Sequence, residues 1–333
     1  RKLDNCYNLD NNWFCDLPVE PHFRINHSEM GDSSRWASGN WQIGNNVVTC
    51  KAWDDTRNIT IETFTVSVTG SNAATTTGPF TITNDSTGGD CTSIGTWSSA
   101  SKTCQLTTNL THGIIIGSND ITLDGNGKTI TGTYTALNPS AATFTEGILV
   151  DGKTGVTLSN VEIYNVPTGI YLSSSENNWI VHSRLIDNGY GVSLYDSPNN
   201  QITNTAFNSE DGYGIKVDRS HLNVITSNTF FGASSGISVS NSNQLTIDDN
   251  TFLSNQHGVY LHSVGSISVL DNIFESNSQS GMRIDGAGWH TITGNTFKDG
   301  LSGIQCSGSE SNTISDNIIT NNKPSNFGLA GTS

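Results

Sequence analysis

Polar residues with acid, base and ligand-binding chemistry recur at fixed offsets from a series of regularly spaced glycines. On three of four successive repeats, these residues are Lys216, Asp218, Tyr260, His262, Arg283 and Asp285. His262 and Asp285 lie one repeat apart, and such a pair can exchange protons with a substrate. We therefore take Asp218, His262 and Asp285 as candidate catalytic residues. The alternative is a solvated face whose opposite charges pair between repeats.

The same face carries groups that suit a sugar. Tyr171 and Tyr260 project from it and can stack on sugar rings. Lys216 and Arg283 can bind a sugar carboxylate, which makes these four residues the candidate glycan-binding set. Tyrosines 190 and 213 share a different repeat position, where a structural stack is an equal alternative. The histidines do not cluster at ligand spacing, so we expect no metal and no cofactor.

The elements that position these residues follow from a strict repeat. Its anchor glycines are 22 or 23 residues apart: Gly147, Gly169, Gly191, Gly214, Gly236, Gly258, Gly281 and Gly303. Apolar residues follow each glycine at the first and third positions, which turns one face of a short strand inward. One coil cannot bury its apolar face, whereas stacked coils bury a continuous column. The sequence therefore predicts an all-β fold dominated by a right-handed parallel β-helix.

Two further columns keep the same spacing. An apolar column contains Ile163, Leu185, Phe207, Phe230, Phe252, Phe274, Phe297 and Ile319. An amide column contains Asn228, Asn250, Asn272, Asn295 and Asn317. We expect the phenylalanines to stack in the core and the asparagines to form a ladder at the strand spacing of about 4.8 Å.

The repeat resembles that of the right-handed parallel β-helix superfamily, which includes pectin-degrading enzymes, alginate epimerases and phage tailspikes. The string from Ile121 to Ile130, ITLDGNGKTI, matches the common first coil of that superfamily. The resemblance covers about 210 residues and implies the fold, but it says little about function. The Gly-His-Gly motif of the pectinases and the Asp-Pro-His-Asp string of the epimerases are both absent. Their absence makes an enzyme less favoured than a non-enzymatic protein.

Residues 1–70 contain no repeat. A strand that includes Cys50, a turn with Asn58 and the alternating segment from Ile59 to Val68 resemble the closing strands of the hyalin-repeat module, an immunoglobulin-like extracellular fold. We therefore expect a β-sandwich-like module over 1–70, a linker over 71–80 and the β-helix over 81–333. His290, beside Trp289, is expected in a surface turn.

Cysteines and sequons point to an exported chain. A disulfide between Cys91 and Cys104 would staple a hairpin that caps the β-helix, whereas Cys6, Cys15 and Cys50 leave their pairing open. Cys306 is expected as a buried free thiol. Candidate glycosylation sites are Asn26, Asn58, Asn84 and Asn109. We expect an extracellular or cell-surface location, with residue 1 following a removed signal peptide.

The composition limits the partners. The formal net charge is −15, and phosphate backbones need a basic face, so we expect no nucleic-acid partner. No run of about 18 apolar residues is present, so we expect no membrane span. Residues 323–333 carry no amphipathic capping helix, and the open end of a β-helix exposes unpaired backbone groups. A continuation of the chain, a tail folded over the end, or the next subunit stacked on it would each cover these groups, and the last would build a head-to-tail filament.

Three functional hypotheses follow. The preferred one is an extracellular structural or adhesive surface protein that self-assembles head to tail into a filament or sheath. The second is a carbohydrate-active enzyme, a polysaccharide lyase or hydrolase, that uses Asp218, His262 and Asp285. The third is a glycan-binding β-helix without catalysis.

Overall fold

The computed structural model describes residues 78–323, except for 136 and 209–211, and strand β37 (Phe327–Ala330). It also describes the backbone of six strands before residue 69. The chain divides into two units, Arg1–Asn72 and Ala73–Ser333. No helix in the described part of the chain is long and apolar enough to cross a bilayer.

The first unit contains three two-stranded sheets. They pair β1 (Cys6–Leu9) with β2 (Asn12–Cys15), β3 (Val19–Glu20) with β4 (Gly39–Asn40), and β5 (Gly44–Trp53) with β6 (Ile59–Val68). Three separate pairs do not define a sandwich, so the immunoglobulin-like module is not shown. The register sets Cys6 opposite Cys15. The cysteine side chains of this unit lie outside the described residues, and their pairing stays a prediction.

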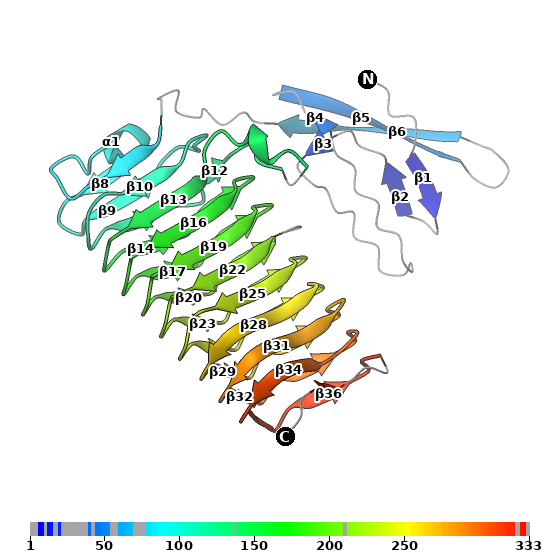
Figure 1. Cartoon of the computed structure of the whole chain (residues 1–333). Helices are drawn as coiled ribbons and strands as arrows, with labels where there is room; N and C mark the ends of the chain where they lie inside the picture. The colour runs from blue at the N-terminus through cyan, green and yellow to red at the C-terminus, as the bar shows by residue number, and fades with distance from the viewer. Residues whose placement is uncertain are drawn as a thin grey trace. The chain divides into compact units, whose positions relative to one another are not determined.

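The second unit is an all-β right-handed solenoid of about ten coils, as the repeat predicts (Figure 1). Three long sheets run along it. Sheet I contains β7 (Phe80–Ile82), β10 (Ile114–Ile116), β13 (Glu146–Asp151), β16 (Thr168–Ser173), β19 (Tyr190–Tyr195), β22 (Tyr213–Asp218), β25 (Ser235–Ser240), β28 (His257–Gly265), β31 (Ser280–Gly288), β34 (Ile304–Glu310) and β37.

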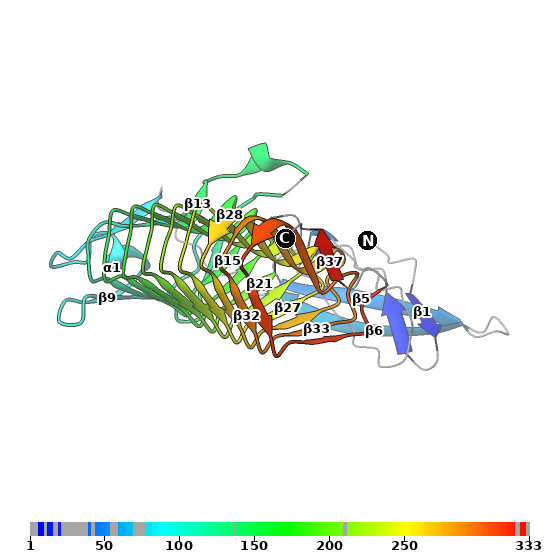
Figure 2. The ribbon, with the colours of Figure 1, turned by 60° about the horizontal axis from the view of Figure 1, so that its bottom comes forward.

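The other two sheets are built from shorter strands. Sheet II contains β8 (Gly95–Ser98), β9 (Thr103–Leu106), β11 (Thr122–Asp124), β14 (Thr157–Ser159), β17 (Trp179–Val181), β20 (Gln201–Thr203), β23 (Val224–Thr226), β26 (Thr246–Asp248), β29 (Ser268–Leu270), β32 (Thr291–Thr293) and β35 (Thr313–Ser315). Sheet III contains β12 (Thr129–Thr131), β15 (Glu162–Tyr164), β18 (Arg184–Ile186), β21 (Ala206–Asn208), β24 (Thr229–Phe231), β27 (Thr251–Leu253), β30 (Ile273–Glu275), β33 (Thr296–Lys298) and β36 (Ile318–Thr320). Figure 2 shows the coils following one another as stacked rungs.

The core consists of the predicted columns. The phenylalanine rings stack with centroid distances of 4.8, 4.8, 4.7 and 4.5 Å along the series Phe207, Phe230, Phe252, Phe274 and Phe297. The anchor glycines are required by this packing. A Cβ atom on Gly214 would lie 2.6 Å from both the Phe230 ring and the carbonyl oxygen of Gly236. Tight packing therefore explains the repeat of glycine.

The amide ladder is also present. Nδ2 of each asparagine donates to Oδ1 of the next at 3.0–3.1 Å, along Asn228, Asn250, Asn272, Asn295 and Asn317. Each Oδ1 also accepts a backbone N–H from the preceding coil, such as that of Asn250 on Asn272, at 2.8 Å. These buried amides are therefore satisfied by one another and by the backbone.

The start of the solenoid carries the predicted staple. Cys91 and Cys104 form a disulfide that joins helix α1 (Cys91–Ile94) to strand β9. Strands β8 and β9 pair antiparallel, and β9 then pairs in parallel with β11. The insertion after β12 contains a 3-10 turn, η1 (Pro139–Ala141). Cys306 is a buried free thiol whose pKa is raised by burial.

Candidate functional site

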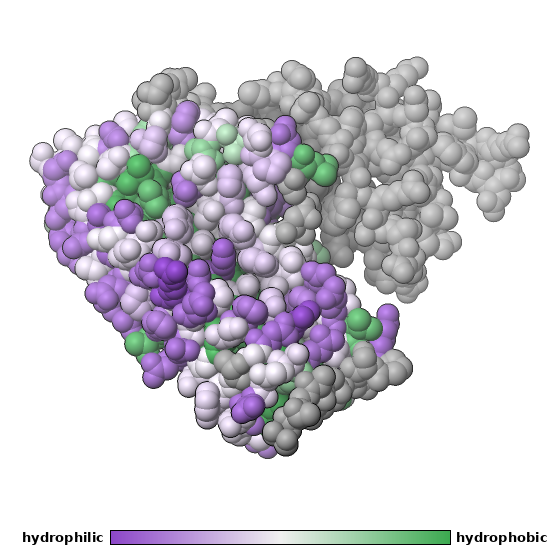
Figure 3. Space-filling model, viewed as in Figure 1, coloured by the Kyte–Doolittle hydropathy of each residue, from purple (hydrophilic) through white to green (hydrophobic). Residues whose placement is uncertain are grey.

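Sheet I exposes side chains two and four residues after each anchor glycine, because the apolar residues beside them point inward. The residue immediately before the glycine is also partly exposed from Glu146 to Tyr213, but it is buried from Ser235 onward. We call these outward columns the sheet I face. Hydrophilic side chains gather over the middle coils of this face, among smaller hydrophobic patches (Figure 3). All six polar residues singled out by the sequence lie on it.

A hollow of about 160 Å³ lies on the sheet I face, between β13 and β22. We call it the tyrosine hollow, and its lining is Glu146, Thr168, Tyr171, Tyr190, Ser193, Leu194, Tyr195, Lys216 and Asp218. Of the predicted residues, it brings together Tyr171, Lys216 and Asp218. The three lining tyrosines are all partly exposed. A hollow walled by phenol rings, an amine and carboxylates offers both stacking surfaces and hydrogen-bonding groups.

The cations of this region already have aromatic partners. The Lys216 ammonium lies 5.3 Å from the centroid of the Tyr190 ring, which itself stacks on Tyr213 at 5.6 Å. Arg219 lies 5.4 Å from the Tyr195 ring centroid, and its Nη1 donates to the Tyr195 hydroxyl at 2.8 Å. Such contacts hold the rings in place. The stack of Tyr190 and Tyr213 matches one of the two predicted alternatives, and Tyr190 also lines the hollow.

The remaining predicted residues form a second cluster farther along sheet I. Asp285 Oδ2 accepts hydrogen bonds from Arg283 Nε at 2.8 Å and from the Tyr260 hydroxyl at 2.9 Å. The Arg283 guanidinium also lies 5.3 Å from the Tyr260 ring centroid. Burial, and then the bond to Asp285, raises the pKa of Tyr260. Arg283 and Asp285 thus already form an ion pair between side chains that are 40% and 21% exposed.

The expected acid/base pair is adjacent but not bonded. His262 and Asp285 are register partners on β28 and β31, yet no hydrogen bond joins their side chains. His262 is exposed, and its ring lies 6.1 Å from that of Tyr260. Asp218 lies two strands away from His262 and accepts from Ser240 at 3.2 Å and from Asn241 at 2.8 Å. The three candidate catalytic residues therefore lie on one face without forming a joined catalytic unit.

A histidine that was not among the candidate site residues lies beside this cluster. His257 is 7% exposed, and its Nδ1 lies 2.7 Å from Oγ of the buried Ser280. Burial, and then the charge of Arg283, lowers the pKa of His257. Its repeat position could have indicated this place, since His257 precedes an anchor glycine as Tyr190 and Tyr213 do.

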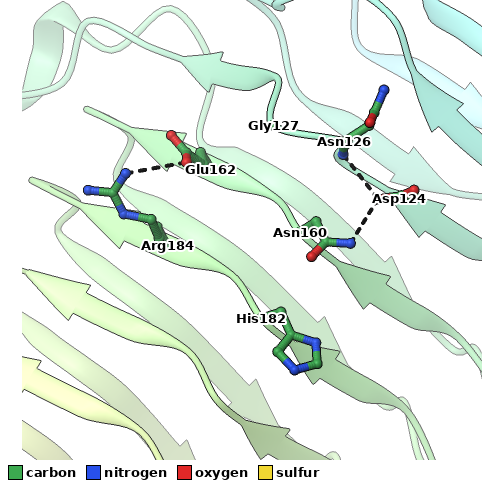
Figure 4. A pocket seen from close by; sticks show the side chains of 7 residues that line it. All are labelled: Asp124, Asn126, Gly127, Asn160, Glu162, His182 and Arg184. Carbon is green, nitrogen blue, oxygen red and sulfur yellow. Dashed lines mark hydrogen bonds and ion pairs between the residues drawn. The ribbon is translucent and has the colours of Figure 1, made fainter.

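A larger hollow, of about 390 Å³, lies away from the sheet I face, at the turns that lead from sheet II to sheet III. We call it the turn groove, and its lining is Asp124, Asn126, Gly127, Asn160, Glu162, His182 and Arg184 (Figure 4). None of these residues was predicted as a site. They come from three successive coils, and only a folded coil brings the turns together.

Hydrogen bonds fix the carboxylates of the turn groove. Asp124 accepts from Gln105 Nε2 at 2.9 Å, from Asn160 Nδ2 at 3.1 Å and from the backbone of Asn126 at 3.0 Å. Partial burial alone would raise the pKa of Asp124, but these three bonds together lower it below its usual value. Asp124 is therefore an ionised acceptor at neutral pH.

The other side of the groove carries an ion pair. Glu162 accepts from Arg184 Nη1 at 3.3 Å and from the Tyr164 hydroxyl at 2.8 Å. Burial, and then the bond to Glu162, raises the pKa of Tyr164 to about 12. His182 is exposed, and its ring makes no hydrogen bond to the described residues. The described part of the chain contains no group of three or more His, Cys, Asp or Glu side chains placed to hold a metal ion.

The sequons differ in access. Asn84 is exposed in a turn. Oδ1 of Asn109, which is partly buried, accepts the backbone N–H of Thr129 at 3.1 Å, so this bond does not involve Nδ2, the atom that would carry an N-linked glycan. Asn26 and Asn58 lie outside the described residues.

The expectation for His290 was wrong. The neighbouring Trp289 is 69% exposed, but the His290 ring is turned inward and is only 1% exposed. Burial lowers the pKa of His290 to about 4.

Comparison with known proteins agrees with this architecture. The chain belongs to the family described as "right handed beta helix region", whose model matches residues 92–252, 146–288 and 257–333. No curated protein matches the chain. Among solved structures, the DFA-IIIase from Arthrobacter chlorophenolicus A6, in complex with GF2, is 14% identical with a TM-score of 0.55. That match covers 65% of this chain and 63% of the DFA-IIIase.

Two other similar structures are a mutant of the periplasmic alginate epimerase AlgG and PfbA, a surface adhesin of Streptococcus pneumoniae. The epimerase is 13% identical with a TM-score of 0.44, over 63% of this chain and 64% of that one. The adhesin is 14% identical with a TM-score of 0.42, over 65% and 79%. At 14% identity, the likeness to the DFA-IIIase shows the fold alone.

Proposed function

We propose that the chain is an exported β-helix that binds a carbohydrate on the sheet I face, with the tyrosine hollow as the principal contact. The single observation that carries this proposal is the set of partly exposed tyrosine rings, Tyr171, Tyr190 and Tyr195, around one hollow. The faces of sugar rings carry C–H groups that pack on phenol rings, and their hydroxyls need polar partners. Asp218 and Glu146 provide acceptors at the edges of the same hollow.

The arrangement of the coils suits an extended ligand. The hollow spans four neighbouring strands, β13 to β22, which is roughly 15 Å at the strand spacing. This length accommodates two or three sugar residues in line with the solenoid axis. Tyr260 and His262 continue the face beyond β25 and offer further contacts to a longer chain.

Binding is favoured over hydrolysis at the predicted residues. Glycosidases place two carboxyl groups about 5 to 9.5 Å apart across the bond that they cleave. Asp218 and Asp285 stand three strands apart, roughly 14 Å between their backbones. Asp285 is also tied to Arg283 and Tyr260. These features support a binding face, with a lyase or hydrolase at Asp218, His262 and Asp285 as the weaker proposal.

Export is part of the proposal. The buried disulfide between Cys91 and Cys104 is of a kind that persists in oxidising compartments. The exposed sequon at Asn84 is compatible with the same location. The disulfide therefore supports a secreted or surface-bound chain.

The test is binding to a glycan array of neutral and acidic oligosaccharides, followed by calorimetry on the best ligand. The variants Tyr171→Ala and Tyr195→Ala should each weaken binding by roughly threefold to tenfold, because each removes a stacking surface. Phe231→Ala is the matched control, since Phe231 is an aromatic residue 42% exposed on sheet III. Unchanged affinity in both tyrosine variants, or an equal loss in the control, would refute the proposal.

A further inference from the structure

We propose that the turn groove is a second carbohydrate site, which takes one uncharged sugar residue through its hydroxyl groups. This goes beyond the sheet I proposal, because the groove lies at the junction of sheets II and III and shares no lining residue with the tyrosine hollow. Figure 4 shows Asp124, Asn126 and Asn160 on one side of the groove, with Glu162 and Arg184 on the other.

The repeats themselves provide a comparison for this groove. From β14 onward, each turn between sheets II and III contains one residue with positive φ, and in the first two of these coils it is Asn160 and His182, whereas the preceding turn contains two, Asn126 and Gly127. Later coils use Asn204, Ser227, Asp249, Asp271, Gly294 and Asp316 at the same position. The turn geometry therefore requires a residue that tolerates this backbone, but it does not require an imidazole.

The first residue of each sheet III strand also differs between the groove coils and the later coils. Glu162 and Arg184 begin β15 and β18, whereas the later strands begin with Ala206, Thr229, Thr251, Ile273, Thr296 and Ile318. The coil fold is thus compatible with small or apolar residues at this position. Charged residues stand at this position only in coils that line the groove. In a repeat protein, solvent-facing residues that differ from those of the neighbouring repeats indicate a binding face.

The groove is preorganised on one side. Asp124 is held by three hydrogen bonds, and Asn160 is fixed by donating one of them. Oδ1 of Asn160 accepts no hydrogen bond from the described residues, and Asn126 is anchored through Nδ2 to the carbonyl oxygen of Leu106 at 3.1 Å. Rigid acceptors of this kind lose little entropy when a ligand hydroxyl donates to them.

The opposite side offers donors. Arg184 donates through Nη1 to Glu162, and its side chain is 55% exposed. Nη2 and Nε of its guanidinium, and both nitrogens of the His182 ring, make no hydrogen bond to the described residues, so they can contact a ligand oxygen. Neighbouring hydroxyls of a sugar both donate and accept, so one residue can bond to both sides of the groove.

The charges indicate the class of sugar. The lining carries the two carboxylates of Asp124 and Glu162 against the single guanidinium of Arg184, in a chain of net charge −15. A uronic acid or a phosphate would meet this excess of negative charge and would need Arg184 to leave Glu162. An uncharged sugar meets no such cost.

The experiment is saturation-transfer NMR, followed by calorimetry, with neutral gluco-, galacto- and fructo-oligosaccharides and with oligogalacturonate. The double variant His182→Asn/Arg184→Thr installs residue types that the chain already uses at these positions, so the coil should fold. Asp271→Asn/Ile273→Thr makes the corresponding changes in one coil, four coils away, and is the matched control. Circular dichroism and thermal melting check that both variants are folded.

The wild-type chain should bind at least one neutral oligosaccharide and not oligogalacturonate at this groove. The H182N/R184T variant should lose at least tenfold in affinity for that site, while D271N/I273T binds as the wild type does. A variant combining Tyr171→Ala with Tyr195→Ala should retain the groove site, so failure of the sheet I proposal would appear separately. Unchanged binding in H182N/R184T, preference for the uronate, or absence of any neutral ligand for the wild type would overturn the inference.

Discussion

Nδ1 of His290 accepts the backbone N–H of Ile267 from the preceding coil at 3.2 Å. Three asparagines at the same position of earlier coils accept the same kind of bond: Asn178, Asn200 and Asn223. His290 thus replaces an asparagine in a second amide column, which ends on Asn312. Its Nε2 is buried without a hydrogen-bond partner among the described residues. The His290 imidazole therefore accepts the kind of backbone bond that an asparagine amide accepts in earlier coils. Unlike an amide, it can also bind a proton.

This relationship makes the stability of the chain sensitive to acid. The pKa of His290 is about 4 in the folded chain and 6.5 in an exposed histidine, so between these values the unfolded chain binds a proton that the folded chain does not. Stability should fall as pH drops from about 6.5 to about 4, by up to about 3 kcal/mol. His290→Asn should remove most of that loss, as measured by urea unfolding at several pH values. His257→Asn is the comparison variant, because burial also lowers the pKa of His257 and this variant should remove a separate part of the loss. An unchanged acid slope in His290→Asn would contradict this explanation.

The phenylalanine column should dominate the stability of the middle coils. Phe252 is fully buried and stacks on Phe230 and Phe274, so Phe252→Ala should cost about 3 to 5 kcal/mol through lost burial and a cavity. Phe231→Ala removes an exposed ring and should cost less than about 1 kcal/mol. Chemical denaturation of both variants measures the difference. Equal losses would show that the column is not the core.

The asparagine ladder should not tolerate an apolar replacement. Asn272→Leu removes the acceptor of Asn250 and the donor to Asn295, which leaves buried polar groups unpaired. We expect a loss of about 2 to 4 kcal/mol. Asn272→Thr is the milder comparison, because Thr205 occupies the same repeat position and accepts the backbone N–H of Ser183. Thermal melts should rank the wild type, the threonine variant and the leucine variant in descending order, and any other order contradicts the ladder.

The disulfide should stabilise the first coil. It closes a loop with a sequence separation of 13, which corresponds to about 3 kcal/mol of chain entropy. The variant Cys91→Ser/Cys104→Ser should unfold at lower urea concentration than the wild type. A reducing agent should shift the wild type toward the variant and leave the variant unchanged. A reductant effect of equal size in the variant would assign the stabilisation elsewhere.

Self-association stays a prediction from the sequence. The filament or sheath hypothesis expects end-to-end contacts, so the mass measured by light scattering should rise with concentration. Sedimentation at several salt concentrations would separate such contacts from charge effects, since a chain of net charge −15 repels itself most at low salt. A constant monomer mass at high concentration would count against the hypothesis.

The β-helix could be predicted from residue spacing, because glycine, phenylalanine and asparagine recur at intervals of 22 or 23 residues. Each recurs for one physical reason: glycine for tight packing, phenylalanine for stacking in the core, and asparagine for the amide ladder. The prediction for His290 was wrong because its neighbour Trp289 indicates a surface turn, whereas the column that His290 shares with Asn200 and Asn223 points inward. The turn groove was not predicted, because Asp124 precedes the strict repeat and lies near His182 only once the coils stack. The bonds that tie Asp285 to its neighbours depend on side-chain rotamers, which spacing does not determine.

The most direct test of the central claim is a crystal structure of the chain with a neutral oligosaccharide selected from the glycan array. We predict sugar density packed against Tyr171 and Tyr195, with hydroxyl contacts to Asp218, along sheet I. The same crystals should show no sugar on Phe231. A bound oligosaccharide that avoids the sheet I face, or a well-ordered tyrosine hollow that stays free of sugar at saturating concentration, would contradict the claim.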